Sequence, residues 1–174
     1  MKRFIAFFAF ALIFTSCANE GTGSGESGSD GVKKGEEVEQ TPVKERESVE
    51  EVSFEVKTVG ETMTEMKYEP NRLEVAPGTR VTIILENAAS SEAMIHNWVL
   101  IEAGSQGEVT QQALDAGVDK DFIPDTPKII AATGLANPGE TQEMEFVAPD
   151  RKGTYQFICT YPGHTSMKGI FLVK

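Results

Sequence analysis

The last 22 residues of the chain, "GTYQFICTYPGHTSMKGIFLVK" (Gly153–Lys174), contain the pattern that decides the fold. Apolar and polar residues alternate in its first seven and last seven positions, and this period of two predicts two half-buried β-strands. The segment between them contains Pro and Gly and is predicted to be a loop. Cys159, His164 and Met167 lie in or beside this loop, although the whole chain has only two cysteines and two histidines.

The same alternation recurs through the chain before this segment. Strands are also predicted at 52–60, 80–85, 96–103 and 141–149, and 66–75 is predicted to be extended. The exception is 110–116, which is rich in helix formers and precedes a helix-ending Gly117 and a Pro-rich loop. Many short strands with one such excursion predict an all-β fold over 52–174. The expected architecture is a Greek-key β-sandwich or barrel of antiparallel strands with one short helical flap.

The composition limits the kinds of partner. The hydrophobic fraction of 40% and the charged fraction of 25% are typical of a soluble globular protein. The net charge is −11, whereas a protein that binds phosphates needs a basic face. We therefore expect no nucleic-acid partner.

Residues 1–16 have the layout of an export signal. Two basic residues come near the start, an apolar run follows, and Thr15 and Ser16 are small. The apolar run is too short to span a bilayer as a helix. Because Cys17 comes next, the segment resembles a bacterial lipoprotein signal peptide, which implies that Cys17 is lipidated and becomes the mature N-terminus. The alternative is a plain secreted protein in which Cys17 is incidental.

The segment 17–51 is predicted to be a flexible tether. It is Gly/Ser-rich and then charged, with ten acidic and four basic residues from Glu20 to Glu51. Such a segment cannot bury enough apolar surface to offset the entropy of ordering it. With a lipid on Cys17, these segments predict a lipid-anchored protein of the bacterial cell envelope, on the outer membrane and facing the periplasm.

Cys159 has no cysteine partner once Cys17 is assigned to lipid. An isolated thiol in an oxidising compartment needs protection or a use. His164 and Met167 follow it closely, and the only other histidine, His96, begins a predicted strand. Thiolate and thioether favour copper(I), imidazole suits both copper oxidation states, and the four together match the blue-copper electron-transfer site.

Three other interpretations compete with copper. Structural zinc normally takes four nitrogen or sulfur ligands, usually several cysteines, and does not select methionine. A catalytic dyad of Cys159 and His164 would leave Met167 without a role. The last alternative is a buried free cysteine with two unrelated surface histidines. Under that alternative, it would be a coincidence that both histidines and the one cysteine not assigned to lipid fit a single ligand set.

Three stretches of the chain resemble the cupredoxins, and specifically azurin and the auracyanins. These stretches are "HNWVL" (His96–Leu100), "AGVDKDFIPDTPKIIA" (Ala116–Ala131) and "CTYPGHTSMKG" (Cys159–Gly169). The resemblance extends from about Phe54 to Lys174, and the middle stretch corresponds to azurin's helical flap. It implies an eight-stranded Greek-key fold that holds one type 1 copper ion per chain.

The resemblance also implies a role for each matching residue near the metal. His96, Cys159 and His164 would be the equatorial ligands, and Met167 would be the long axial ligand. The carbonyl of Ile95 would be a weak axial contact on the other side. Ile95 stands where azurin has a glycine. In "HTSM" the histidine and the methionine are one residue closer in sequence than in azurin. Near the metal, this chain therefore departs from azurin at both axial contacts.

Further implied roles concern the surroundings of the ligands. Asn97 matches the asparagine that ties the two ligand loops together near the sulfur. His164 matches the ligand whose edge reaches solvent through an apolar surface patch and passes the electron. Tyr161, Pro162 and Met94 are the expected members of this patch.

These inferences favour a membrane-tethered carrier of single electrons that is not an enzyme. Four protein ligands leave no open position for a substrate, so no small-molecule substrate is expected. The expected partners are other exported redox proteins, such as cytochromes, oxidases or reductases. Two alternatives are a copper storage or delivery protein, and a domain that kept the fold for interaction only. The methionines are scattered rather than clustered, which is weak support for copper delivery.

Overall fold

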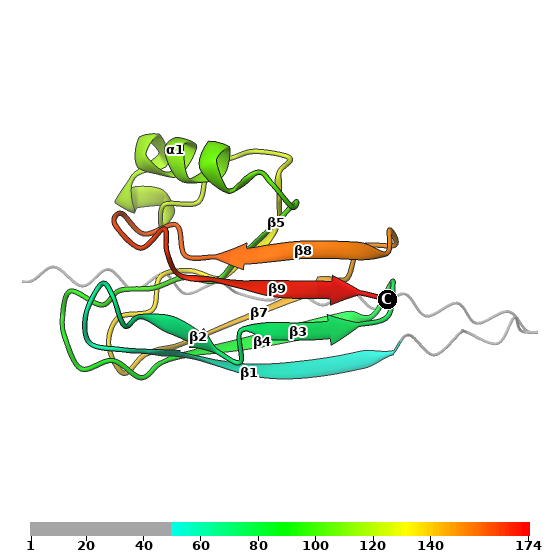
Figure 1. Cartoon of the computed structure of the whole chain (residues 1–174), viewed down its shortest axis with the longest axis horizontal. Coiled ribbons are helices and arrows are strands. Elements are labelled where there is room, and N and C mark those ends of the chain that lie inside the picture. Colours follow the sequence, from blue (N-terminus) through cyan, green and yellow to red (C-terminus); the bar gives the residue numbers. More distant parts are fainter. Residues whose placement is uncertain (1–49) are drawn as a thin grey trace, which may run out of the picture. The chain divides into compact units, whose positions relative to one another are not determined.

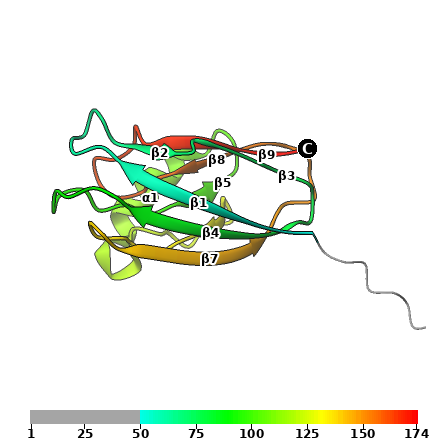
Figure 2. The same cartoon turned by 90° about the horizontal axis from the view of Figure 1, so that it is seen from below.

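The computed structural model describes residues 50–174, which form two β-sheets packed face to face with one helix outside them (Figures 1 and 2). This arrangement confirms the predicted all-β sandwich with one helical flap. The signal peptide at 1–16, Cys17 and nearly all of the tether at 17–51 lie outside the described residues. The first strand begins at Glu51, one residue before the predicted start of the folded domain.

One sheet has four strands in the order β2-β1-β4-β7. Its strands are β1 (Glu51–Val59), β2 (Lys67–Glu69), β4 (Arg80–Asn87) and β7 (Thr141–Val147). The second sheet has five strands in the order β3-β9-β8-β5-β6. Its strands are β3 (Arg72–Val75), β5 (Val99–Ile101), β6 (Ile129–Ala132), β8 (Gly153–Ile158) and β9 (Lys168–Val173).

Both sheets are mixed, which corrects the expectation of purely antiparallel strands. β1 runs parallel to β4, and β3 runs parallel to β9. The cause is the predicted extended segment at 66–75, which forms two short strands. The first of them, β2, pairs with β1 in one sheet, and the second, β3, pairs with β9 in the other.

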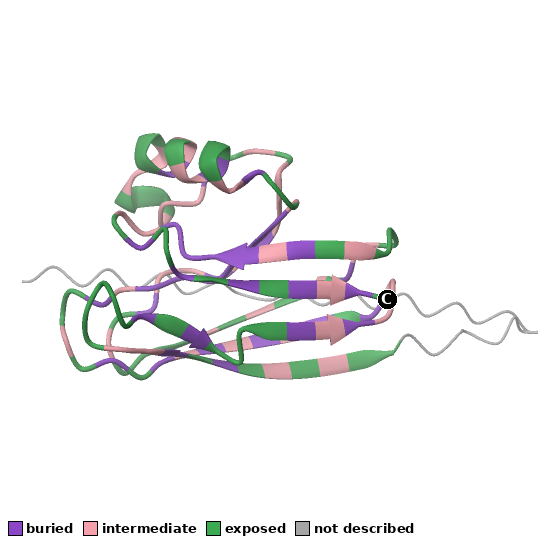
Figure 3. Cartoon of the chain, in the orientation of Figure 1, coloured by how far each residue is buried: buried purple, intermediate pink, exposed green. Residues whose placement is uncertain are grey.

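The core lies between the two sheets, and the alternation of each strand builds it. Val81, Ile83 and Leu85 of β4 are fully buried, and the residues between them are only partly covered (Figure 3). Trp98 is buried at the centre, where its ring stacks on Phe157 with 5.3 Å between centroids. Burial of such large apolar side chains is the main stabilising contribution to a fold of this kind.

The helix α1 (Gln106–Ala116) packs on the outer face of the five-stranded sheet (Figure 1). Its buried Val109 contacts Val99, Ile101 and Ile158, so β5 is covered on both faces. This contact explains why the helix begins four residues before the predicted start at 110. A short 3-10 turn, η1 (Val118–Lys120), follows the helix.

Two strand predictions in this region are wrong. β6 lies within the segment predicted to be a loop, and it pairs with β5. β5 is only three residues long, whereas the sequence predicted a strand over 96–103. His96 therefore lies outside the strand that it was expected to begin. No helix among residues 50–174 is long and apolar enough to cross a membrane.

The two ends of the sandwich differ (Figure 1). The loop end is the end where β8 stops and β9 starts, together with the adjoining part of α1. The terminal end is the opposite end, where β1 starts at Glu51 and the chain stops at Lys174.

Candidate metal centre

The loop at 159–167 is folded by its own backbone. Cys159 N–H donates to the Met167 carbonyl at 3.2 Å, which closes the loop at its base. His164 N–H donates to the Tyr161 carbonyl at 3.0 Å, and Met167 N–H donates to the His164 carbonyl at 2.9 Å. These two turns bring the chain from His164 to the start of β9 at Lys168. The three sequence-predicted residues on this loop are therefore held by one compact piece of backbone.

His96 comes from a different part of the chain and is held by an isolated bridge. Its N–H donates to the Ala136 carbonyl at 3.1 Å, and its own carbonyl accepts the Ala136 N–H at 2.7 Å. Two residues after His96, the Trp98 N–H donates to the Thr133 hydroxyl at 3.0 Å. These contacts fix His96 at the loop end without a regular strand.

The side chains of His96, Cys159 and His164 converge in the interior and are all buried. The Cys159 Sγ atom lies 3.9 Å from His96 Nδ1 and 3.8 Å from His164 Nδ1, and the two nitrogen atoms are 3.2 Å apart. A point equidistant from the three atoms lies about 2.1 Å from each, within the roughly 2.0–2.3 Å that zinc keeps to the same ligand atoms. The three donors thus fit one transition-metal ion between them.

Burial sets the protonation of these groups in the metal-free protein. It lowers the pKa of His96 to about 4, with a smaller contribution from the neighbouring His164. Burial also lowers the pKa of His164, against a partial opposing effect of the Ile95 carbonyl. Both imidazoles are therefore neutral at pH 7 and have a lone pair to offer, as metal ligation requires.

The thiol of Cys159 is pushed in the opposite direction. Burial raises its pKa to about 11, and backbone N–H donation from Asn97 and Tyr161 opposes this effect. These two N–H groups point at the sulfur and would stabilise a thiolate. A metal ion that binds here must displace the thiol proton, so metal binding is coupled to the release of a proton.

Asn97 ties the two ligand-bearing segments together, as the resemblance implied. Its side-chain N–H₂ donates to the Thr160 hydroxyl at 2.8 Å and to the Asp121 carbonyl at 3.0 Å. Its side-chain oxygen accepts the Thr160 N–H at 2.9 Å. Because Thr160 directly follows Cys159, the sulfur and His96 cannot move apart without breaking these bonds.

The two predicted axial groups lie beside this centre. Met167 is buried in the same core cluster as Cys159. The carbonyl of Ile95 faces the His164 imidazole, as its effect on the pKa of that residue shows. The Met167 carbonyl accepts the Cys159 N–H, so the methionine backbone adjoins the cysteine. The isoleucine side chain of residue 95 is half-buried.

The predicted surface patch needs two corrections. The edge of His164 was expected to reach solvent, but this residue is only 1% exposed. Tyr161 and Pro162 are half-exposed, and the Tyr161 ring lies 5.0 Å from the His164 ring between centroids. Met94 is only 3% exposed and belongs to the core. Its N–H donates to the Ser91 carbonyl at 2.9 Å, and this turn directs the side chain inward.

The exposed methionine beside the ligand loop is Met63, which no sequence pattern singles out. Met63 is 46% exposed and lies over Gly163, because a Cβ atom at Gly163 would come within 2.7 Å of its Cε atom. It lies in the connection between β1 and β2, far from the ligands in sequence. Only the tertiary fold brings it to the loop.

Two buried polar residues were also missed. Asn87 donates to the carbonyls of Met94 at 2.7 Å and Ala136 at 2.9 Å, which fixes the backbone on both sides of His96. Tyr68 donates its hydroxyl hydrogen to the Asn97 carbonyl. The signal for Asn87 was present in the sequence, since it occupies an inward position in the alternation of β4.

Comparisons with known proteins agree with this geometry. The family model described as "Copper binding proteins, plastocyanin/azurin family" matches residues 54–174. Auracyanin-A of Chloroflexus aurantiacus is 38% identical over 116 residues, which cover 65% of this chain and 68% of that protein. An azurin of Pseudomonas fluorescens biotype C is 29% identical over 127 residues, which cover 69% of this chain and 99% of that protein.

The fold comparison gives the same result. The solved structure of auracyanin A, described as a "blue" copper protein of Chloroflexus aurantiacus, matches with a TM-score of 0.64 and 36% identity. The match covers 71% of this chain and 99% of the auracyanin chain.

Proposed function

Because the chain belongs to the plastocyanin/azurin family of copper-binding proteins, we propose that it is a membrane-tethered protein that carries single electrons between exported redox proteins. Copper is the cofactor of the family, and the buried group of His96, Cys159 and His164 is consistent with one type 1 copper site. The convergence of these three donor atoms is the observation that supports the proposal most strongly.

The proposed equatorial ligands are Nδ1 of His96, Sγ of Cys159 and Nδ1 of His164. Met167 is proposed as the long axial ligand and the Ile95 carbonyl as a weak contact on the other side. Bound copper would supply a one-electron couple between Cu(I) and Cu(II). The burial of all three donors keeps water away from the site.

The protein's own groups hold these ligands in place. The N–H groups of Asn97 and Tyr161 donate to the sulfur, and the side chain of Asn97 locks the loop that carries it. The bridge to Ala136 and the Asn87 amide hold His96 from the other side. A site fixed in this way changes little between oxidation states, which favours fast electron exchange.

We propose no enzymatic activity for the isolated chain. A site with three buried strong donors and an axial thioether offers a substrate no open position. The proposed place of action is the bacterial cell envelope, with the lipid on Cys17 and the outer membrane facing the periplasm. The proposed partners are exported redox proteins such as cytochromes, oxidases or reductases, and no nucleic acid.

The first test is a visible absorption spectrum of the full chain after addition of Cu(II). A thiolate–copper site gives a strong band in the red region that a reductant bleaches. Cys159→Ser should abolish the band, because it removes the thiolate while preserving the shape of the side chain. The matched control is Cys17→Ser, which should keep the band but release the protein from the membrane fraction. A colourless wild-type protein that retains zinc would refute the electron-carrier proposal.

A further inference from the structure

The ligand loop leaves a short piece of backbone exposed between two of its proposed ligands. Only Thr165 and Ser166 separate His164 from Met167, and both are exposed, whereas the two flanking residues are buried. The backbone hydrogen bonds that fold the loop use no group of Thr165 or Ser166. The orientation of the peptide between them therefore depends on a contact from outside the loop.

The helix α1 supplies this contact. Gln106, the first residue of α1, donates its side-chain Nε2 hydrogen to the Thr165 carbonyl at 2.6 Å. Among residues 50–174, this is the only hydrogen bond that a side chain outside the loop donates to the backbone of residues 161–167. Because a peptide group is planar, holding the Thr165 oxygen also holds the plane that continues into Ser166.

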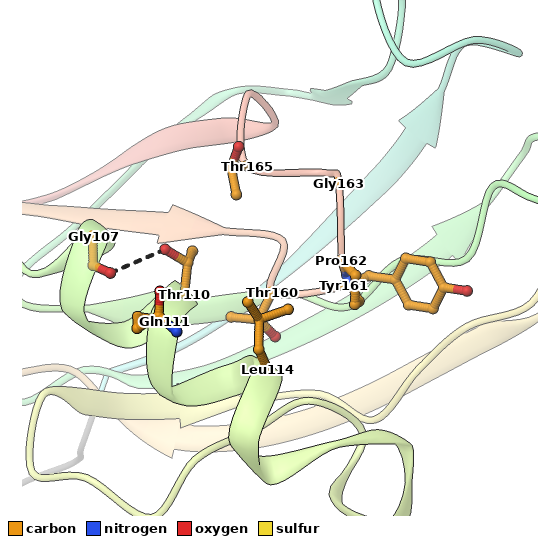
Figure 4. Close-up of a pocket in the computed structure, with 9 residues that line it drawn as sticks. All are labelled: Gly107, Thr110, Gln111, Leu114, Thr160, Tyr161, Pro162, Gly163 and Thr165. Atoms are coloured by element: carbon orange, nitrogen blue, oxygen red, sulfur yellow. Dashed lines mark hydrogen bonds between the residues drawn. The ribbon is translucent and has the colours of Figure 1, made fainter.

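A groove separates α1 from the ligand loop beside this bond (Figure 4). It has a volume of about 250 Å³. Gln111 and Leu114 line it on the helix side, and residues 160–163 and Thr165 line it on the loop side. Since the groove keeps these side chains of the helix and the loop apart, the bond from Gln106 is the direct polar link between the two.

The helix end that carries Gln106 is fixed to the five-stranded sheet. Val109 is fully buried against β5, one turn after Gln106. The Ser105 hydroxyl donates to the Glu102 carbonyl at 2.6 Å, just beyond the end of β5. The Thr110 hydroxyl donates to the carbonyl of Gln106 itself at 2.8 Å. The donor is therefore attached to a rigid part of the fold, whereas its acceptor lies on an exposed loop.

We propose that Gln106 is a positioning residue of the metal centre. By holding the Thr165 carbonyl, it limits how far His164 and Met167 can move relative to each other. The proposal rests on the proposed copper function and adds to it a residue that contacts no ligand side chain. Groups that orient the ligands from behind in this way contribute to metal affinity and to the tuning of the metal.

Two substitutions separate the hydrogen bond from the stability of the helix. Gln106→Glu keeps the shape of the side chain and suits the start of a helix, but the carboxylate has no hydrogen to donate. Gln106→Lys keeps a donor on a long side chain, although a cation at the start of a helix is unfavourable. The effects on the hydrogen bond and on the helix are therefore opposite in the two variants.

The first measurement is the release of copper from the loaded full chain to excess EDTA, together with the reduction potential. Gln106→Glu should speed the release about tenfold and shift the potential, whereas Gln106→Lys should stay within about twofold of the wild-type rate. The reverse order of the two variants would show that they act through the helix, and it would overturn the proposal.

The same substitutions at Gln111 are the matched controls for charge. Gln111 lines the groove from the same helix and is exposed, and the bond to the loop comes from Gln106 instead. Gln111→Glu and Gln111→Lys should leave copper release within about twofold of wild type, because a single exposed charge is screened by salt. Equal effects of glutamate at 106 and at 111 would assign the change to charge and overturn the proposal.

A second measurement does not depend on copper. In the isotope-labelled, metal-free full chain, NMR relaxation should show lower order parameters for the amides of Thr165 and Ser166 in Gln106→Glu than in wild type. Gln106→Lys should preserve the wild-type values, and unchanged values in Gln106→Glu contradict the proposal. If wild-type protein binds no copper, the proposed function fails and the relaxation data still test the contact. If wild type binds copper and Gln106→Glu matches it in release, potential and relaxation, only the positioning role fails.

Discussion

At the scale of single residues, the centre depends on polar groups that are not ligands. His96 Nε2 is buried and has no hydrogen-bond partner in the described part of the chain. The orientation of this ring is therefore set by packing and by the backbone on either side of it. Asn87 and Tyr68 fix that backbone through buried hydrogen bonds to carbonyl groups, and Asn97 contributes a buried hydrogen bond to the Thr160 hydroxyl.

Tyr68→Phe tests this dependence directly. The change leaves the Asn97 carbonyl without its buried donor, which should lower the free energy of unfolding by about 1–3 kcal/mol. Because the N–H of Asn97 donates to the Cys159 sulfur, the visible band and the reduction potential should also shift. The measurements are chemical denaturation of the metal-free protein and spectroscopy of the copper form.

Tyr155→Phe is the matched control. The Tyr155 hydroxyl donates to the Arg151 carbonyl at 2.8 Å, at the terminal end and away from the ligands. Its loss should cost about 1 kcal/mol of stability and leave the spectrum unchanged. If Tyr68→Phe lowers stability without changing the band or the potential, its role is structural only.

The grouping of the three donor side chains could be predicted at this scale, whereas the polar residues that hold them could not. His96, Cys159 and His164 stand out because each belongs to a rare residue type in this chain. The exposure of Met63 and the burial of Met94 follow from how loops that are distant in sequence pack. No local pattern distinguishes these two methionines.

At the scale of secondary-structure elements, α1 ends at a glycine that cannot be replaced without strain. Gly117 has φ 69° and ψ −178°, a combination that is essentially confined to glycine. Nothing lies within 4 Å of a Cβ atom built at this position, so the constraint is purely conformational. This turn directs the chain from the helix toward η1 and the loop end.

Gly117→Ala should therefore lower the free energy of unfolding by about 1–3 kcal/mol. Gly107→Ala is the control, since Gly107 lies inside the same helix with open space around its Cβ position. Alanine is the better helix former, so Gly107→Ala should stabilise the protein by up to about 1 kcal/mol. Equilibrium denaturation checks both values. Equal effects of the two substitutions would show that the backbone at 117 is not strained.

Elements were predictable where one strand face is buried. β4, β8 and β9 alternate clearly and were predicted within a few residues. β6 has the sequence Ile-Ile-Ala-Ala, without alternation, and it was missed. Its strand character comes from pairing with β5, which is a long-range contact. The parallel pairing of β3 with β9 was likewise invisible to local patterns.

At the scale of the whole molecule, one residue reports on the packing of both sheets. Trp98 is the only tryptophan of the chain and is fully buried. Its indole N–H has no hydrogen-bond partner among residues 50–174, and its aromatic neighbours are Phe146, Phe157 and Phe171. The ring is therefore shielded from bulk solvent and surrounded mainly by apolar aromatic groups.

The metal-free folded protein should therefore emit at unusually short wavelength when tryptophan is excited. Unfolding should move the emission to that of water-exposed tryptophan in a single transition, because the ring sits where the two sheets meet. A fluorescence spectrum recorded during denaturation checks this. Cys17→Ser serves as the control, since residue 17 lies outside the described residues that surround Trp98 and its substitution should not alter the emission. Emission typical of hydrated indole in the folded protein would contradict the packing described.

The positions of Glu51 and Lys174 have a practical consequence. Glu51 and Lys174 both lie at the terminal end, and the ligand loop lies at the other. A linker that joins Lys174 to an electrode surface would therefore turn the His164 side toward the solution. A linker grafted into the connection at 61–65 would turn the His164 side toward the electrode surface. The form linked through residues 61–65 should exchange electrons with the electrode faster than the form linked through Lys174. The form linked through Lys174 should exchange electrons faster with a redox protein in solution.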